Sequence, residues 1–125
     1  MNIICINSRD ELNLIDLDKI ACIQANGNYS NLMYIEGQKL MISIGLSQFE
    51  QIINRAAGDS ANESGGNPFV RLGRSVIINK RYLTQISMVK QKLLLSDRGK
   101  HAYQLIVPKQ TLKAFKDLIR AQYGS

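Results

Sequence analysis

Apolar residues in the first half of the chain gather in short runs that polar residues separate. Short runs rich in Ile and Leu, bounded by turn-forming residues, are typical of β-strands. The sequence Asn26-Gly27-Asn28 predicts a tight turn between two of them. We therefore expect four or five strands in a meander, at residues 3–7, 12–16, 20–25, 32–35 and 40–44.

Two other segments have the spacing of helices. Between residues 46 and 56 apolar side chains recur every three or four positions, and Ser47 followed by Glu50 predicts a capping box at the start of this helix. Pro108 suits the first turn of a second helix, because the N–H that proline lacks would be unpaired there. The apolar residues that this helix is expected to bury are Leu112, Phe115, Leu118 and Ile119.

Between these helices we expect a flexible polar loop at residues 58–67, followed by further strands and a hairpin turn at residues 96–100. The predicted fold class is therefore mostly β with short α-helices: packed antiparallel sheets, one mid-chain helix and a C-terminal helix. A chain of 125 residues has the size of one domain. We expect residues 1–125 to form a single domain.

Several functional classes find little support. The N-terminus does not read as a signal peptide and no apolar run is long enough to span a membrane, which predicts a cytoplasmic protein without a membrane partner. Cys5 and Cys22 lie in strand-like runs, where reduced, buried thiols are expected. Only His101 could join them as a ligand, so we predict no metal site and no cofactor. Without paired carboxylates, a phosphate loop or a nucleophile motif, we predict no catalytic residue and no enzyme.

The net charge is +6, but the basic and acidic residues are distributed unevenly between the two halves of the chain. Residues 1–66 contain four basic and eight acidic residues, a net charge of −4, whereas residues 67–125 contain twelve basic and two acidic residues, a net charge of +10. A strongly basic half attracts polyanions. Charge alone does not distinguish DNA from RNA or from an anionic membrane surface.

Arg71 and Arg74 lie in the segment FVRLGRS, between apolar runs. If its alternating apolar side chains point inward, both arginines point outward, and Gly73 allows the backbone to approach a partner closely. The planar guanidinium group suits guanine bases and phosphates equally well. A surface ion pair is the alternative, although this half of the chain offers few acidic partners.

The last helix carries a basic stripe. At about 100° per residue, Lys109, Lys113, Lys116 and Arg120 fall within a sector roughly 60° wide. Like charges in one stripe repel each other, and Lys109 opposes the helix dipole. These two costs indicate an anionic partner. The alternative is a solvated face that Asp117 partly neutralises.

The turn after the third predicted strand is a further candidate for contacts with nucleic acid. Asn28, Tyr29, Ser30 and Asn31 are uncharged hydrogen-bonding residues that suit phosphates or base edges. A plain polar turn is the alternative, and Tyr29 could instead lie at the edge of the core.

Four segments together resemble the LytTR-type DNA-binding domain, a family of bacterial transcriptional regulators. These segments are IACIQANGNYSNLMYI (20–35), LSQFEQII (46–53), FVRLGRSVIINKRYL (69–83) and VPKQTLKAF (107–115). The resemblance covers about residues 3–120. The third segment is its most specific part.

This resemblance implies that loops, rather than a recognition helix, enter successive major grooves on one side of bent DNA. By position, Ser30 would contact the first groove, Arg74 the backbone or minor groove in the middle with Arg71 supporting it, and Lys109 the second groove. Asn79 is expected to cap backbone groups instead. The full set of expected DNA contacts is Asn28, Tyr29, Ser30, Asn31, Arg71, Arg74, Lys80, Lys109 and Lys113.

The chain departs from the family pattern at two places. It has Gly73 where the family often has histidine, and Pro108-Lys109 where a serine–arginine pair is common. Lysine lacks the bidentate fork of arginine, which predicts weaker or different base discrimination at that site. Members usually carry a receiver domain or membrane segments upstream. We expect either a free-standing regulator or the DNA-binding part of a longer response regulator of a two-component system.

The main hypothesis is sequence-specific binding of double-stranded DNA in transcription control, on paired direct repeats that a second copy would share. The alternative is a non-catalytic binding module whose basic face docks an acidic protein or RNA. Single-stranded RNA is normally held by exposed aromatic residues, and only 6% of this chain is aromatic. The main hypothesis requires Arg71, Arg74 and Lys109 to share one outward surface.

Overall fold

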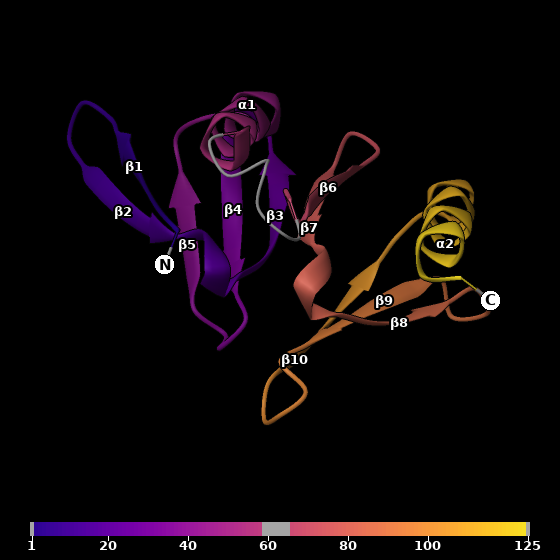
Figure 1. The fold of residues 1–125 in the computed structure, drawn as a ribbon. Helices are drawn as coiled ribbons and strands as arrows, with labels where there is room; N and C mark the ends of the chain where they lie inside the picture. The colour runs from indigo at the N-terminus through magenta and orange to yellow at the C-terminus, as the bar shows by residue number, and fades with distance from the viewer. Residues whose placement is uncertain (1, 59–65, 125) are drawn as a thin grey trace.

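Three antiparallel β-sheets and two α-helices make up the part of the chain that the computed structural model describes, residues 2–58 and 66–124 (Figure 1). The mostly β fold with a mid-chain helix and a C-terminal helix is confirmed. Most of the loop expected at residues 58–67 lies outside the described residues.

A five-stranded sheet with the order β5-β4-β3-β7-β6 lies at the centre of the fold. The predicted turn consists of Gly27 and Asn28, and the next strand begins earlier than expected, at Tyr29. Every pair of neighbouring strands is antiparallel. The strands are β3 (Ile20–Asn26), β4 (Tyr29–Tyr34), β5 (Lys39–Ile42), β6 (Phe69–Leu72) and β7 (Val76–Asn79).

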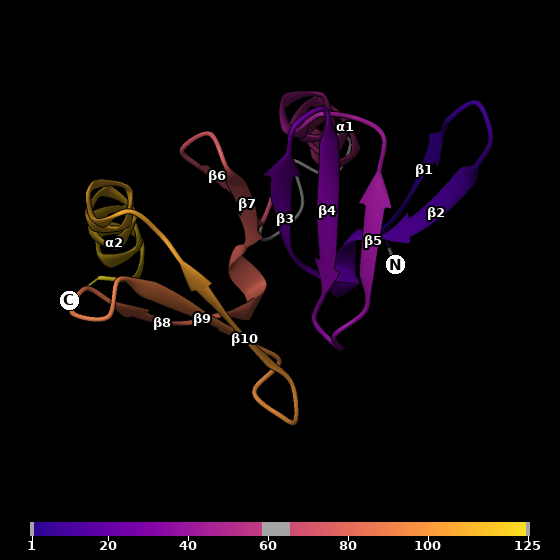
Figure 2. The ribbon, with the colours of Figure 1, turned by 180° about the vertical axis from the view of Figure 1, so that it is seen from behind.

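Smaller sheets and the helices lie around this sheet (Figures 1 and 2). A hairpin of β1 and β2 lies at one side, and a sheet of β8, β9 and β10 lies at the other with α2 beside it. Helix α1 lies across one face of the central sheet. The bounds are β1 (Ile3–Asn7), β2 (Leu12–Asp16), α1 (Leu46–Gly58), β8 (Leu83–Ser87), β9 (Lys92–Ser96), β10 (Ala102–Ile106) and α2 (Lys109–Tyr123), with one-turn 3₁₀ helices η1 (Leu17–Lys19) and η2 (Lys80–Tyr82).

Both faces of the central sheet are covered, which explains why all four residues of β7 are buried. Successive side chains of a strand point to opposite faces. Ile77 therefore packs with α1 and the first hairpin, whereas Val76 and Ile78 pack with β9, β10 and α2. The central sheet thus separates two apolar cores.

Helix α1 begins two residues earlier than the capping-box prediction requires, because an N-cap at Ser47 would place the first helical residue at Gln48. The N–H of Phe49 donates to the carbonyl of Gly45 at 3.0 Å, so the helix starts at Leu46. Ser47 consequently lies inside the first turn instead of ahead of it. The predicted capping box is therefore wrong, and Glu50 has another partner.

At the end of β7, the side chain of Asn79 connects β3 with the 3₁₀ helix η2. It is fully buried, its amide donates to the carbonyl of Ile20 at 3.0 Å, and its side-chain oxygen accepts from the N–H of Arg81 at 3.0 Å. Just beyond it, the Tyr82 hydroxyl donates to the carbonyl of Asp18. The backbone-capping role expected for Asn79 is confirmed.

Two expectations about burial need correction. Cys5 is exposed, because its side chain points to the outer face of the β1–β2 hairpin; Cys22 is buried, and burial raises the pKa of its thiol to about 12. Leu118 is 53% exposed, whereas Leu112 and Phe115 are buried as predicted. The buried stripe of α2 is therefore narrower than its sequence indicated.

Candidate nucleic-acid interface

Two turns of the central sheet lie side by side at one end of the sheet. Gln24 of β3 pairs with Val76 of β7, and the N–H of Ala25 donates to the carbonyl of Ser75 at 2.8 Å. This register brings the β3–β4 turn next to the β6–β7 turn (Figure 1). Two of the regions that the sequence singled out are therefore neighbours.

The start of α2 packs against the β6–β7 turn. A Cβ atom added to Gly73 would lie 3.7 Å from Thr111 Oγ1, in ordinary van der Waals contact. A hollow of about 130 Å³ at this junction is lined by residues of both elements, Arg74 and Pro108 among them. Lys109, the first residue of α2, is exposed beside it. The third predicted region thus joins the other two.

Arg71 holds the β6–β7 turn in shape. Gly73 has a φ of +64°, in the left-handed region that favours glycine. The Nε of Arg71 donates to the carbonyl of Gly73 at 3.0 Å, and its Nη2 donates to the carbonyl of Arg74 at 3.3 Å. These bonds fix the backbone on both sides of the turn and leave Arg74 exposed.

The remaining nitrogen of Arg71 binds α1. Its Nη1 donates to Glu50 Oε1 at 2.9 Å, and the side chains of Arg71 and Glu50 are 23% and 36% exposed. The ion-pair alternative is therefore correct for Arg71, with an acidic partner from the first half of the chain. Since all three nitrogens of its guanidinium group are engaged, its geometry fits the supporting role that the resemblance implied.

The structure divides the four polar residues of the β3–β4 region. Asn28 and Tyr29 are exposed at the turn, Asn31 is half-buried, and Ser30 is fully buried. The Ser30 hydroxyl donates to the carbonyl of Ile44 at 2.8 Å. Alternation along β4 turns the Ser30 side chain toward the core, so its burial does not favour the predicted contact with DNA, which stays a prediction.

Two of the other predicted cations are not gathered with these residues. Lys113 lies further along α2 and pairs with Asp117 at 3.3 Å. Lys80 lies in η2, at the opposite end of β7 from Arg74, and its Nζ donates to Gln122 Oε1 at 3.4 Å. Lys80 therefore lies away from the gathered turns, and Lys113 lies one turn further along α2 than Lys109.

The single histidine belongs to the β9–β10 turn, which points away from the gathered turns (Figure 1). The His101 ring donates to Asp97 Oδ2 at 2.8 Å. This bond, together with the N–H groups of Gly99 and His101, lowers the pKa of Asp97 below its ordinary value. Within residues 2–58 and 66–124, no three His, Cys, Asp or Glu side chains are placed to hold a metal ion.

A family model described as the LytTr DNA-binding domain matches residues 10–120. The chain belongs to this family. The resemblance that the sequence motifs indicated is thereby confirmed, and the match spans all three gathered segments of this LytTr domain.

Comparison with solved structures supports the fold. The LytTr DNA-binding domain of a putative methyl-accepting/DNA response regulator from Bacillus cereus has a TM-score of 0.59 with this chain, over 95% of this chain and 97% of that one. At 17% identity the likeness concerns the fold alone. No curated protein matches the chain. Among the helices of the described residues, none has the length and apolarity that crossing a bilayer requires.

Two residues of this arrangement could not be found from the sequence. Glu50 was assigned to a capping box, whereas it pairs with an arginine 21 residues away. Thr111 carries no motif, and its contact with Gly73 depends on how α2 packs beside the central sheet. Both contacts depend on the three-dimensional packing of segments that are distant in the sequence.

Proposed function

We propose that this LytTr domain binds double-stranded DNA sequence-specifically and acts in bacterial transcription control. The contact surface is the end of the molecule formed by the β3–β4 turn, the β6–β7 turn and the start of α2, which we call the DNA end. The observation that carries this assignment is the packing of the Gly73 turn against Thr111, because it brings α2 to the two turns that the hydrogen bond between Ala25 and Ser75 already joins.

The residues of the DNA end suit different parts of a duplex. The exposed guanidinium group of Arg74 can bind a phosphate or a guanine through two nitrogens. Lys109 presents a point charge at a helix N-terminus, where the N–H groups also favour phosphate. Asn28 and Tyr29 are exposed hydrogen-bonding residues on the neighbouring turn. We propose that these turns enter successive major grooves.

Phosphate contacts supply most of the affinity in such interfaces, and a few side chains supply the specificity. We therefore assign specificity to Arg74, Lys109 and Asn28, and assign Arg71 the role of holding Arg74 in place. We further propose that two copies bind paired direct repeats. A response regulator that carries this domain would use such sites to control transcription.

The first test is selection of bound sequences from a random duplex pool by the 125-residue chain. We expect one short motif to become enriched, and repeats of it at a fixed spacing if two copies bind together. Fluorescence anisotropy then compares the selected duplex with a scrambled duplex, a single-stranded RNA and an acidic peptide. Tighter binding of the RNA or the peptide would overturn the proposal in favour of the alternative binding module.

The second test removes single cations. Arg74→Ala and Lys109→Ala should each weaken binding to the selected duplex about tenfold or more, and binding to scrambled duplex less, because base contacts are worth about 1–3 kcal/mol. Lys39→Ala is the control, since this exposed residue lies at the opposite end of β5 from the DNA end. If the selected duplex binds both variants as tightly as the parent, the assigned surface is wrong.

A further inference from the structure

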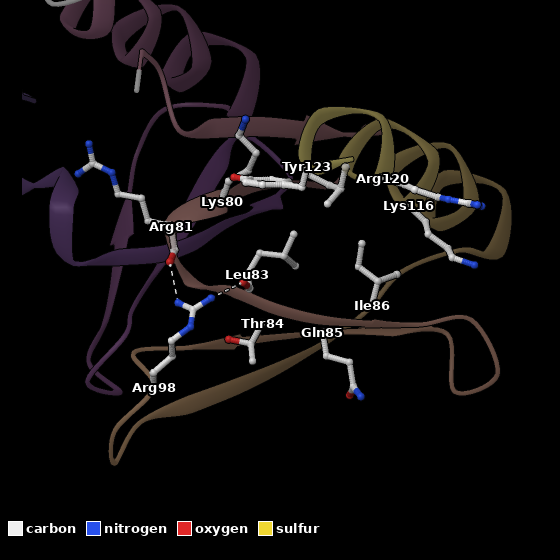
Figure 3. A pocket seen from close by; sticks show the side chains of 11 residues that line it. Lys80, Arg81, Leu83, Thr84, Gln85, Ile86, Arg98, Lys116, Arg120 and Tyr123 are labelled. Atoms are coloured by element: carbon white, nitrogen blue, oxygen red, sulfur yellow. Dashed lines mark hydrogen bonds between the residues drawn. The ribbon is translucent and has the colours of Figure 1, made fainter. Parts of the chain in front are cut away.

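A second group of cations surrounds a hollow between β8 and the C-terminal part of α2 (Figure 3). The hollow has a volume of about 540 Å³, which lies within the range of about 300–1,000 Å³ that is usual for small-molecule sites. We call it the α2–β8 hollow. The cations that line it are Lys80, Arg81, Arg98, Lys116 and Arg120.

The base of the hollow is apolar. Leu83 and Ile86 rise from β8 toward α2 (Figure 3), and Ile119 of α2 also lines the hollow. These three side chains are half-buried. Tyr123, 74% exposed, adds an aromatic ring at the rim. Such an apolar surface offers favourable contacts to the carbon atoms of a bound organic group, whereas solvated cations gain no stabilisation from it.

Few of the positive charges around this hollow have an acidic neighbour. Arg81 pairs with Asp18 at 3.2 Å, on the side of η1. Arg98 also lines the hollow and donates to the carbonyls of Arg81 and Leu83, at 3.4 and 3.1 Å (Figure 3). Among the described residues, no acidic side chain lines the hollow.

Five cationic residues line this one hollow. Like charges around a partly apolar surface repel one another, and the repulsion increases as the local dielectric constant falls. A bound anion relieves this repulsion and accepts charge-assisted hydrogen bonds from Lys116 and Arg120. The apolar base adds a favourable contact for any carbon skeleton attached to that anion.

We propose that the α2–β8 hollow binds a small organic anion, a phosphate monoester or a carboxylate, that carries an apolar or aromatic group. The anionic group lies at Lys116 and Arg120, and the apolar group lies against Leu83 and Ile86. This site is separate from the DNA end, because Arg120 is eleven residues along α2 from Lys109, about 16 Å along the helix axis. The proposal does not rest on the proposed function.

The test uses 1-naphthyl phosphate, which joins a phosphate to an aromatic ring, and records amide shifts of the 125-residue chain by NMR. We expect saturable shifts confined to residues 80–86 and 116–123. Inorganic phosphate lacks the ring and 1-naphthol lacks the charge, so each should bind at least tenfold more weakly. Shifts that follow all surface cations alike, or no saturation at millimolar concentration, would overturn the proposal.

Variants locate the site. Lys116→Gln with Arg120→Gln should weaken binding of 1-naphthyl phosphate at least tenfold, whereas Lys39→Gln, a matched removal of charge on β5, should change it less than twofold. Far-UV circular dichroism checks that the double variant is folded. The second variant is Ile86→Ala, which leaves every charge in place and should also weaken binding of 1-naphthyl phosphate. Unchanged binding by both variants would exclude the hollow.

The same double variant separates a small-molecule site from an extension of the DNA interface. Measured without 1-naphthyl phosphate, its affinity for duplex DNA should remain within about threefold of the parent. A loss as large as that of Arg74→Ala would assign these cations to DNA phosphates and overturn the proposal. If no duplex binds the parent chain, saturable binding of 1-naphthyl phosphate still supports the hollow.

Discussion

The DNA end and the α2–β8 hollow are both basic, yet they are built differently. At the DNA end, single exposed cations project from turns, and Arg71 fixes one of these turns through two carbonyls and Glu50. At the hollow, five cationic residues surround a half-buried apolar base. The first arrangement suits an extended polyanion that lies across several turns. The second suits a compact anion.

This difference shows that net charge is a poor guide to the number of basic surfaces. A charge of +10 in residues 67–125 indicated one surface for one polyanion. The fold instead sends Arg74 and Lys80 to opposite ends of β7, because a strand of four residues separates them.

The strongest separation of the two regions comes from Arg74→Ala combined with Lys109→Ala. We expect affinity for the selected duplex to fall about a hundredfold, because two contacts of about 1–3 kcal/mol are lost. Binding of 1-naphthyl phosphate should change less than twofold. Anisotropy and NMR titrations measure the two affinities. A parallel loss of both would mean that the two basic regions act as one.

Asn79→Ala should affect both regions through stability. The substitution leaves the carbonyl of Ile20 buried without its donor and removes the cap of η2, which predicts a loss of about 2 kcal/mol in the free energy of unfolding. Urea unfolding followed by circular dichroism measures it. Gln51→Ala, at an exposed position of α1, is the control and should stay within about 0.5 kcal/mol of the parent.

Arg71→Met tests the clamp on the DNA end. It keeps much of the side-chain volume but removes the ion pair and both turn contacts, so we expect about 1 kcal/mol of lost stability. DNA affinity should fall about tenfold because Arg74 is no longer held. Glu50→Gln should reproduce part of this loss without removing a cation. Normal affinity in Arg71→Met would show that the turn keeps its shape unaided.

The smallest effect concerns the turn that carries Arg98. The pKa of Asp97 is lowered by the His101 ring and by two N–H groups, so its contribution to stability is present above the ordinary pKa of about 4 and is lost as pH falls through the lowered value. In Asp97→Asn this pH dependence should disappear. Melting temperatures between pH 5 and pH 2 measure the difference. A parent and variant that lose stability in parallel over this range would contradict the assignment.

Much of the secondary structure followed from local patterns. The predicted strands at residues 3–7 and 12–16 have the observed bounds, and β3 ends one residue later than expected. The errors arose where a local motif competed with a tertiary contact. Ser47 and Glu50 have the spacing of a capping box, but the helix starts at Leu46 and Glu50 binds Arg71 instead.

For the candidate site, sequence patterns found the segments but not the orientation of each side chain. Ser30 and Tyr29 are adjacent polar residues at a turn, yet one is buried and the other is 46% exposed. Which of them points outward depends on the side of β4 that α1 covers. Lys80 and Arg74 were both expected to contact DNA, but the strand β7 between them places them at opposite ends of that strand.

The sequence by itself determined the family, the mostly β fold, the two helices and the excess of positive charge in the second half. These properties depend on local periodicity, on turn residues and on motifs within single segments. Only the tertiary structure decided that two turns and the start of α2 share one end, that Arg71 pairs with α1 and that five cationic residues line one hollow. The physical reason is that strand register and helix packing bring together residues that no local pattern connects.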